Sequence, residues 1–276
     1  MRATLYQVDA FADRPFEGNP AAVVPLETWL PDAVMQALAA ENNLAETAFF
    51  VPEGEAYRLR WFTPTTEVRL CGHATLATAH VIFTQLGYSA PEIAFETLSG
   101  RLTVTRDGDK LAMNFPAEKP KPMPEPEGLS DALGAKPRAY ARTANVLAVF
   151  DTPQEVAGLK PNFPQLAKIL TPFNAVLIAS ARTPEDGEFD FVSRVFAAAH
   201  GINEDPVTGS SYCTSAPYWA RVLGKDDLVA RQISARGGTV WCSHRGDRVV
   251  IQGRCADYLK GEFEIPDHLL SDEPGR

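Results

Sequence analysis

One glutamate and one histidine stand where a protein could use them to move a proton. Glu46 lies in residues 43–51, directly before an apolar run that is typical of a strand. His73 follows Gly72, where a small and apolar stretch typical of a buried helix begins. A carboxylate at the edge of a strand can act as a general acid or base. A solvated loop glutamate and a structural histidine are the alternative interpretations.

The second half of the chain offers Asp205, four residues before Gly209, where another small and apolar stretch opens. A helix N-terminus presents unpaired N–H groups and a partial positive charge, and glycine lets a ligand approach the backbone closely. Two such ends, at Gly72 and Gly209, facing one another across a cleft would bind a carboxylate or stabilise an enolate-like charge. Two ordinary helix starts, with Asp205 as a plain cap, are the alternative.

The two glycines belong to a pattern of elements that the chain shows twice. Each half contains a stretch that begins with asparagine, a strand that begins with arginine, a glycine-opened helix and a hairpin. The matched segments are residues 19–24 with 145–150, 60–63 with 194–197, and 98–109 with 236–247. Because these matches keep the same order over most of the chain, we interpret them as an internal duplication.

The duplication predicts an α+β fold in which strands wrap a buried helix, made twice. We expect an N-terminal half over residues 1–116, a proline-rich linker over 117–132 and a C-terminal half over 133–276, whose last residues could return to the first half. The second helix contains Pro217, which should kink or shorten it.

Only one half carries a carboxylate at the place of Glu46, since Asn174 stands near the equivalent position. A single acid/base can take a proton from one atom and return it to another on the same face of a substrate. A racemase normally needs two groups on opposite faces. The asymmetry therefore favours a proton shift within one molecule.

Composition excludes several other functions. The net charge of −9 without a block of like charges makes nucleic acid an improbable partner. No apolar run could span a membrane and the first residues show no apolar leader segment, so we expect a cytoplasmic protein. The four cysteines include no CxxC pair, which argues against a zinc site and a disulfide framework.

Taken together, several motifs resemble those of the phenazine-biosynthesis PhzF-like isomerases, which share the diaminopimelate epimerase fold. These motifs run in family order over most of the chain. They are residues 8–11 (VDAF), 18–22 (GNPAA), 43–47 (NLAET), 62–64 (FTP), 70–75 (LCGHAT) and 204–210 (EDPVTGS). The resemblance implies two pseudo-symmetric halves, each a β-barrel around a central helix. It also implies a homodimer that works without a cofactor or metal on a small carboxylate-bearing substrate.

Residue by residue, the resemblance assigns the catalytic glutamate to Glu46 and catalytic partners to His73 and Asp205. It assigns substrate binding to Asn19, Gly72, Gly209 and Ser210. His73, Asp205 and Ser210 would orient the substrate and balance its charge, while Glu46 would move the proton.

Two departures from related patterns bear on the substrate and the reaction. Cys71 stands where diaminopimelate epimerases have their first cysteine, but the second half has none before Gly209, and Cys213 follows that glycine. A two-thiol epimerase is therefore disfavoured. The late segment that lies near the substrate in phenazine enzymes diverges here over residues 236–244. An epimerase or racemase, or a non-catalytic protein that kept the fold, are the alternative functions.

Overall fold

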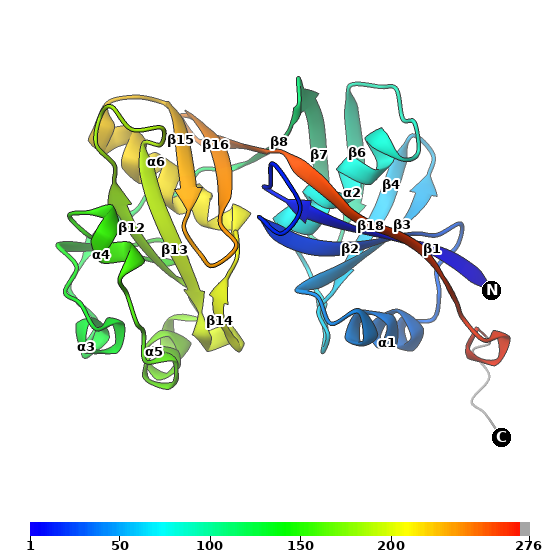
Figure 1. Ribbon diagram of the computed structural model, residues 1–276, viewed down its shortest axis with the longest axis horizontal. Coiled ribbons are helices and arrows are strands. Elements are labelled where there is room, and N and C mark those ends of the chain that lie inside the picture. The colour runs from blue at the N-terminus through cyan, green and yellow to red at the C-terminus, as the bar shows by residue number, and fades with distance from the viewer. Residues whose placement is uncertain (271–276) are drawn as a thin grey trace. The chain divides into compact units, whose positions relative to one another are not determined.

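The structure, a computed structural model, describes residues 1–270, and these residues form two compact units (Figure 1). Unit 1 comprises Met1–Met113 and the residues from Gly253 onward, and unit 2 comprises Asn114–Gln252. The last strand of the chain therefore returns to the first unit. No helix within the described residues is both long and apolar enough to cross a membrane.

Unit 1 contains two main helices and a mixed set of strands. In chain order its elements are β1 (Arg2–Ala10), β2 (Asn19–Pro25), α1 (Asp32–Asn42), β3 (Glu46–Glu53), β4 (Ala56–Phe62), β5 (Glu67–Val68), α2 (Gly72–Thr84), β6 (Glu92–Thr97), β7 (Gly100–Asp107), the start of β8 (Lys110–Pro116), β18 (Cys255–Glu264) and a 3-10 turn, η4 (Asp267–Leu269). The strands pair in the order β18, β1, β2, β3, β4, β6, β7, β8, and β5 pairs with β4.

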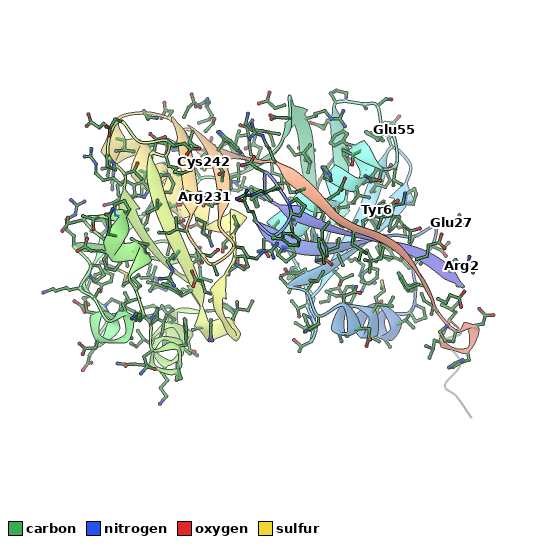
Figure 2. The ribbon with its side chains drawn as sticks, in the orientation of Figure 1. Arg2, Tyr6, Glu27, Glu55, Arg231 and Cys242 are labelled. Carbon is green, nitrogen blue, oxygen red and sulfur yellow. The ribbon has the colours of Figure 1, made fainter. Side chains whose placement is uncertain are left out.

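The first and last strands of the chain are neighbours in unit 1. β1 and β18 pair antiparallel, so the blue and red strands of Figure 1 run side by side. Arg2 and Tyr6 on β1 are labelled in Figure 2. The Arg2 guanidinium lies 3.1 Å from the Glu264 carboxylate, and the Lys260 ammonium lies 5.3 Å from the centroid of the Tyr6 ring. These cross-strand contacts fasten β18 to β1.

Unit 2 repeats the same architecture with additional short helices. Its elements are the strands β9 (Lys121–Met123), β10 (Ala139–Arg142), β11 (Val146–Val149), β12 (Leu177–Arg182), β13 (Phe191–Ala197), β14 (Ile202–Asp205), β15 (Asp227–Gln232), β16 (Gly238–Arg245) and β17 (Arg248–Gly253), the helices α3 (Leu129–Leu133), α4 (Pro153–Ala157), α5 (Phe163–Leu170) and α6 (Tyr212–Leu223), and the 3-10 turns η1 (Thr171–Phe173), η2 (Ala198–His200) and η3 (Gly209–Ser211). The strands pair in the order β9, β10, β11, β12, β13, β15, β16, β17, and β14 pairs with β13.

The two units share both the order of their strands and the sense of every pairing. Each unit has seven successive pairings, and five of them are antiparallel. The third pairing is parallel (β2 with β3, and β11 with β12), and so is the fifth (β4 with β6, and β13 with β15). The fold is therefore mixed α/β, as expected from the repeated sequence pattern. The closed barrel expected around each helix stays a prediction.

The proline-rich segment differs from the linker expected over residues 117–132. Within it, β9 pairs antiparallel with β10, and Pro122 stands opposite Ala141. Proline lacks an N–H but is tolerated in an edge strand, which explains how so proline-rich a stretch joins a sheet. The segment belongs to unit 2.

Helix α2 is buried on nearly all sides, as its composition predicts. It contacts β1, β2, β3 and β18. Nearly every side chain from His73 to Phe83 is buried, and the thiol of Cys71 is buried just before the helix. A small residue such as Ala74 or Ala77 at most positions lets strands approach closely on every face. This packing fixes the N-terminal end of α2 inside unit 1.

Helix α6 runs through Pro217 without being shortened. A proline cannot donate the hydrogen bond to the carbonyl four residues earlier, which leaves the carbonyl of Cys213 without its usual helical donor. The backbone N–H of Glu118 donates to that carbonyl instead, at 2.9 Å. Of the two expected effects, the shortening is therefore wrong, because another segment of unit 2 replaces the lost bond, and the kink stays a prediction.

A matched arginine–glutamate ion pair anchors the loop before each candidate glycine. Arg194 on β13 makes a two-pronged contact with Glu204, with both N–O distances at 2.8 Å. Arg60 on β4 does the same with Glu67, at 2.7 and 2.8 Å. Each arginine also lies over the phenylalanine two residues later, and each glutamate stands five residues before its glycine. The matched sequence segments of the two units thus form matched arginine–glutamate ion pairs.

The Arg194–Glu204 pair should contribute measurably to stability. Arg194→Gln leaves the mostly buried Glu204 carboxylate without its partner and removes the donor to the carbonyl of Leu159. We expect a loss of about 3 kcal/mol in the free energy of unfolding, measured by urea denaturation. The control is Arg182→Gln, which breaks an exposed pair with Glu185 and should cost less than about 1 kcal/mol. Equal losses in the two variants would contradict the anchoring role.

Candidate active site

Glu46 is the first residue of β3, and its side chain is only 15% exposed. Two features place it there. Asn43 ends α1 in a left-handed conformation with φ of 49°, which asparagine tolerates better than most residues, so the chain turns sharply into β3. β3 then pairs in parallel with β2, with Glu46 in register with Ala21. The solvated-loop interpretation of Glu46 is therefore not what the structure shows.

Glu46, His73 and Cys71 form a cluster at the N-terminal end of α2. Nε2 of His73 lies 3.2 Å from Oε2 of Glu46, close enough for an ion pair but not aligned as a hydrogen bond. Sγ of Cys71 lies 3.5 Å from Nδ1 of His73. The imidazole thus stands between a thiol and a carboxyl group.

Burial raises the pKa of the Glu46 carboxyl to about 7, and a hydrogen bond from Cys71 offsets part of this effect. The cause is desolvation, because an ionised carboxylate loses the water that would stabilise its charge. A carboxyl group with a pKa near neutrality exchanges protons readily at physiological pH, which is what a general acid/base requires. The burial and the raised pKa of Glu46 are therefore compatible with a role in proton transfer.

The same three residues offer a zinc-type donor set. The ligand atoms of Glu46, Cys71 and His73 all lie within 4.8 Å of one another. However, His73 presents Nδ1 to the thiol and Nε2 to the carboxyl group, whereas one ion would need a single nitrogen facing both. The two ring nitrogens thus face different groups, which does not suit one metal ion.

Helix α2 begins at Gly72, and its N-terminal end has no side-chain cap, since Cys71 at the N-cap makes no such hydrogen bond. A Cβ built on Gly72 would meet only the Met113 methyl group, at 3.9 Å. Packing does not demand glycine here. An uncapped helix end beside a residue without a side chain leaves room for an anionic group to approach the backbone.

Asn19 lies at the start of β2, two residues before Ala21, the register partner of Glu46. Its side chain is fully buried. The expected substrate contact of Asn19 is not tested by the structure.

The residues expected from the second half lie together in unit 2. Asp205 ends β14, and its carboxylate accepts a short hydrogen bond from the hydroxyl of Thr208. Gly209 opens the 3-10 turn η3, which leads into α6 at Tyr212, so the helix begins later than the sequence suggests. Ser210, within this turn, is exposed. Asp205 is thus held by the turn that precedes the helix.

Gln232 on β15 holds this turn, and sequence analysis did not select it. The side chain is fully buried and uses both ends of its amide. Nε2 donates to the carbonyl of Asp205 at 2.7 Å, and Oε1 accepts from the N–H of Thr208 at 3.0 Å. Burying an amide is costly unless both ends are bonded, so Gln232 fixes the backbone that carries Asp205. The sequence did contain a signal for Gln232, because it is a polar residue at an inward position of a strand with alternating burial.

The register of the strands corrects the expected counterpart of Glu46. Thr47 pairs with Phe62, and Leu177 pairs with Phe196. Because Phe62 and Phe196 are equivalent, the residue that matches Glu46 is Val176, not Asn174. The conclusion that unit 2 lacks the acid is unchanged.

The cysteines of unit 2 do not resemble catalytic thiols. Burial raises the pKa of the Cys213 thiol to about 12, and it raises the pKa of Cys242, labelled in Figure 2, well above its ordinary value. Because the thiolate is the reactive form, both groups are inert near neutral pH. A second thiol to partner Cys71 is not found within the described part of unit 2.

The fold and the site define a two-unit, mixed α/β protein with a buried carboxyl–imidazole–thiol cluster. The family model of the phenazine biosynthesis-like proteins matches residues 8–261, and the chain belongs to this family. The resemblance inferred from the motifs is thereby confirmed.

Individual relatives cover almost the whole chain. An uncharacterized isomerase of Pseudomonas aeruginosa is 50% identical over 265 residues, which are 96% of this chain and 100% of the relative. A PhzF-family phenazine biosynthesis protein of Enterococcus faecalis, solved as a crystal structure, has a TM-score of 0.91 at 41% identity and covers 96% of this chain and 100% of its own.

A hydroxyproline epimerase of Agrobacterium vitis has a TM-score of 0.57 at 13% identity, with 95% of this chain and 92% of that chain covered. This likeness shows the fold alone. The names of three relatives, each called an isomerase, support an isomerase at this coarse level.

Because the pKa of Glu46 is raised in the folded chain, the free energy of unfolding should depend on pH. The carboxyl group is protonated in both folded and unfolded chains below pH 4.5 and ionised in both above pH 7. Between these values only the folded chain keeps the proton, so stability falls as pH rises. Glu46→Gln cannot ionise. From about pH 4 to about pH 8, its free energy of unfolding should gain about 3 kcal/mol relative to the wild type, measured by urea denaturation.

Glu53→Gln is the matched control, because Glu53 ends the same strand but is exposed. Its free energy of unfolding should follow the wild type at every pH. If Glu46→Gln also follows the wild type across this range, the carboxyl group is not buried as the structure has it.

Proposed function

We propose that the protein is an isomerase that moves a proton on a small carboxylate-bearing substrate, with Glu46 as its single acid/base. The carrying observation is the buried Glu46 carboxyl group, with its pKa raised to about 7, beside the uncapped end of α2. Family membership and relatives named isomerases support the same reaction class.

In this proposal the substrate carboxylate approaches the first N–H groups of α2 at Gly72. The partial positive charge there favours an anion, and the missing side chain allows close approach. The ionised Glu46 carboxylate takes a proton from a carbon atom, and the protonated carboxyl group returns it to another atom on the same face. The transient negative charge on the substrate is stabilised by the same helix end.

Contacts within the cluster favour a shift on one face over an inversion. Glu46 receives a hydrogen bond from Cys71 and lies 3.2 Å from His73. The three groups therefore approach a substrate from one side. Inversion at one carbon would need a second base on the opposite face, and these three residues do not provide it.

The remaining roles are part of the proposal. Asp205, Gly209 and Ser210 orient the substrate and balance its charge, and Gln232 keeps their turn in shape. His73 polarises the substrate or donates a hydrogen bond to it, and its own charge does not change. The reaction runs without a cofactor, in a cytoplasmic homodimer.

An epimerase that uses Cys71 is the second candidate function. The observation that favours it is the contact of the Cys71 thiol with Nδ1 of His73, at 3.5 Å, because an adjacent imidazole can activate a thiol. The high thiol pKa of Cys213 weighs against a two-thiol mechanism.

Solvent hydrogen exchange tests the two candidates. The wild type and variants are incubated in deuterium oxide with a panel of small amino and aromatic carboxylic acids, and deuterium incorporation is followed by mass spectrometry. The wild type should exchange at least one acid, with a rate that rises through about pH 7 as Glu46 ionises. Glu46→Gln should slow this exchange about 10²–10⁴-fold, while Glu53→Gln should not.

Cys71→Ser separates the single-base isomerase from the thiol epimerase. The serine hydroxyl can still donate to the carboxyl group but cannot act as a thiolate, so exchange should survive within about tenfold. Loss of exchange in Cys71→Ser together with normal exchange in Glu46→Gln would assign the proton transfer to Cys71 instead of Glu46. Absence of Glu46-dependent exchange with every acid would favour a non-catalytic binding protein.

A further inference from the structure

A basic pocket lies in unit 2 among residues that the proposed isomerase reaction does not use. Its volume is about 560 Å³, and its lining includes three cations, Lys119, Lys121 and Arg142. All three side chains are exposed. The chain as a whole carries a net charge of −9, so such a local excess of positive charge is a distinct feature of this surface.

Two of the three cations stand directly opposite one another. Lys121 on β9 is the register partner of Arg142 on β10 in an antiparallel pair. Like charges at directly opposed positions repel and destabilise a sheet. A lysine on an edge strand commonly prevents edge-to-edge aggregation, which could explain Lys121 on its own. It does not explain why Arg142 stands opposite this lysine.

The structure does not neutralise these charges internally. Within residues 1–270, Lys119, Lys121 and Arg142 make no ion pair with an acidic side chain. Glu118 also lines the pocket, but its carboxylate accepts a hydrogen bond from the hydroxyl of Thr214 at 2.6 Å. One carboxylate against three cations leaves a net positive pocket.

Arg142 is held in place for recognition rather than left free. Its guanidinium carbon lies 4.6 Å from the centroid of the Phe173 ring, a cation–π contact that fixes the plane of the group. An ordered guanidinium offers two parallel N–H donors to an oxyanion, and a nearby lysine adds a point charge. Met123, half-buried at the pocket wall, supplies an apolar surface beside them.

We infer that this pocket binds a small organic molecule through a phosphate monoester. A phosphate dianion has enough oxygens to engage Arg142, Lys121 and Lys119 together, and it relieves the repulsion between the two opposed cations. The pocket is larger than a phosphate ion, so the organic part of the ligand lies against Met123. This site is independent of Glu46 and of the proposed isomerase reaction.

Isothermal titration calorimetry at low ionic strength and pH 8 tests the inference, with phenyl phosphate as the dianionic probe and benzenesulfonate as a monoanion of similar shape. Inorganic phosphate tests the contribution of the organic part. The wild type should bind phenyl phosphate at least about tenfold more tightly than benzenesulfonate, since hydrogen bonds to charged groups are strong. Added salt should weaken the binding.

Arg142→Gln and Lys121→Gln should each weaken phenyl phosphate binding at least about tenfold. Both side chains are exposed, so the fold should be retained. Lys168→Gln is the matched control, because Lys168 is an exposed cation of unit 2 on α5 outside the pocket, and this variant should bind like the wild type.

Three results would overturn the inference: no binding of phenyl phosphate, equal binding of the monoanion, or binding unchanged in Arg142→Gln. Phenyl phosphate that binds the wild type and Arg142→Gln alike but is lost in Glu46→Gln would place the ligand at the end of α2 instead. The exchange assay reads out the isomerase proposal separately, so either proposal can fail alone.

Discussion

The reaction proposed for unit 1 depends on one constraint: the carboxyl group of Glu46 is kept away from water at the N-terminal end of a buried helix. Desolvation makes the group hold its proton up to about pH 7. The same helix end supplies positive charge where a substrate anion would sit. Neither effect would survive if α2 were solvent-exposed, so the proposed reaction depends on the small residues that let strands cover this helix as much as on Glu46.

The two units share a scaffold but differ in the side chains at the candidate site. Both units keep the order of strands, the helix that follows a glycine, and an arginine–glutamate pair before that glycine. At the position of Glu46, however, unit 2 has Val176. In unit 2 the loop before the helix instead carries Asp205, held by Gln232. Different side chains at equivalent places of a shared scaffold agree with the proposed single-base reaction.

Much of this arrangement could be predicted from sequence because it depends on local patterns. Alternating residues and glycine turns identify hairpins, and an apolar helix without a polar face has to be buried. Residues whose roles arise from distant contacts were not accessible in this way. Three contacts join segments that are not neighbours in the chain. They are the pairing of β9 with β10, the hydrogen bond from the N–H of Glu118 to the carbonyl of Cys213, and the hydrogen bond from Gln232 to the carbonyl of Asp205.

The pairing of β18 with β1 makes unit 2 an insertion within unit 1. Its consequence concerns synthesis on the ribosome. Unit 2 is one continuous stretch, so it can fold as soon as it emerges. Unit 1 is translated first but lacks β18 until residues 255–264 have been made. Until then, the edge of β1 that β18 will cover is open to wrong partners, and truncated or stalled chains should be the species most prone to aggregate.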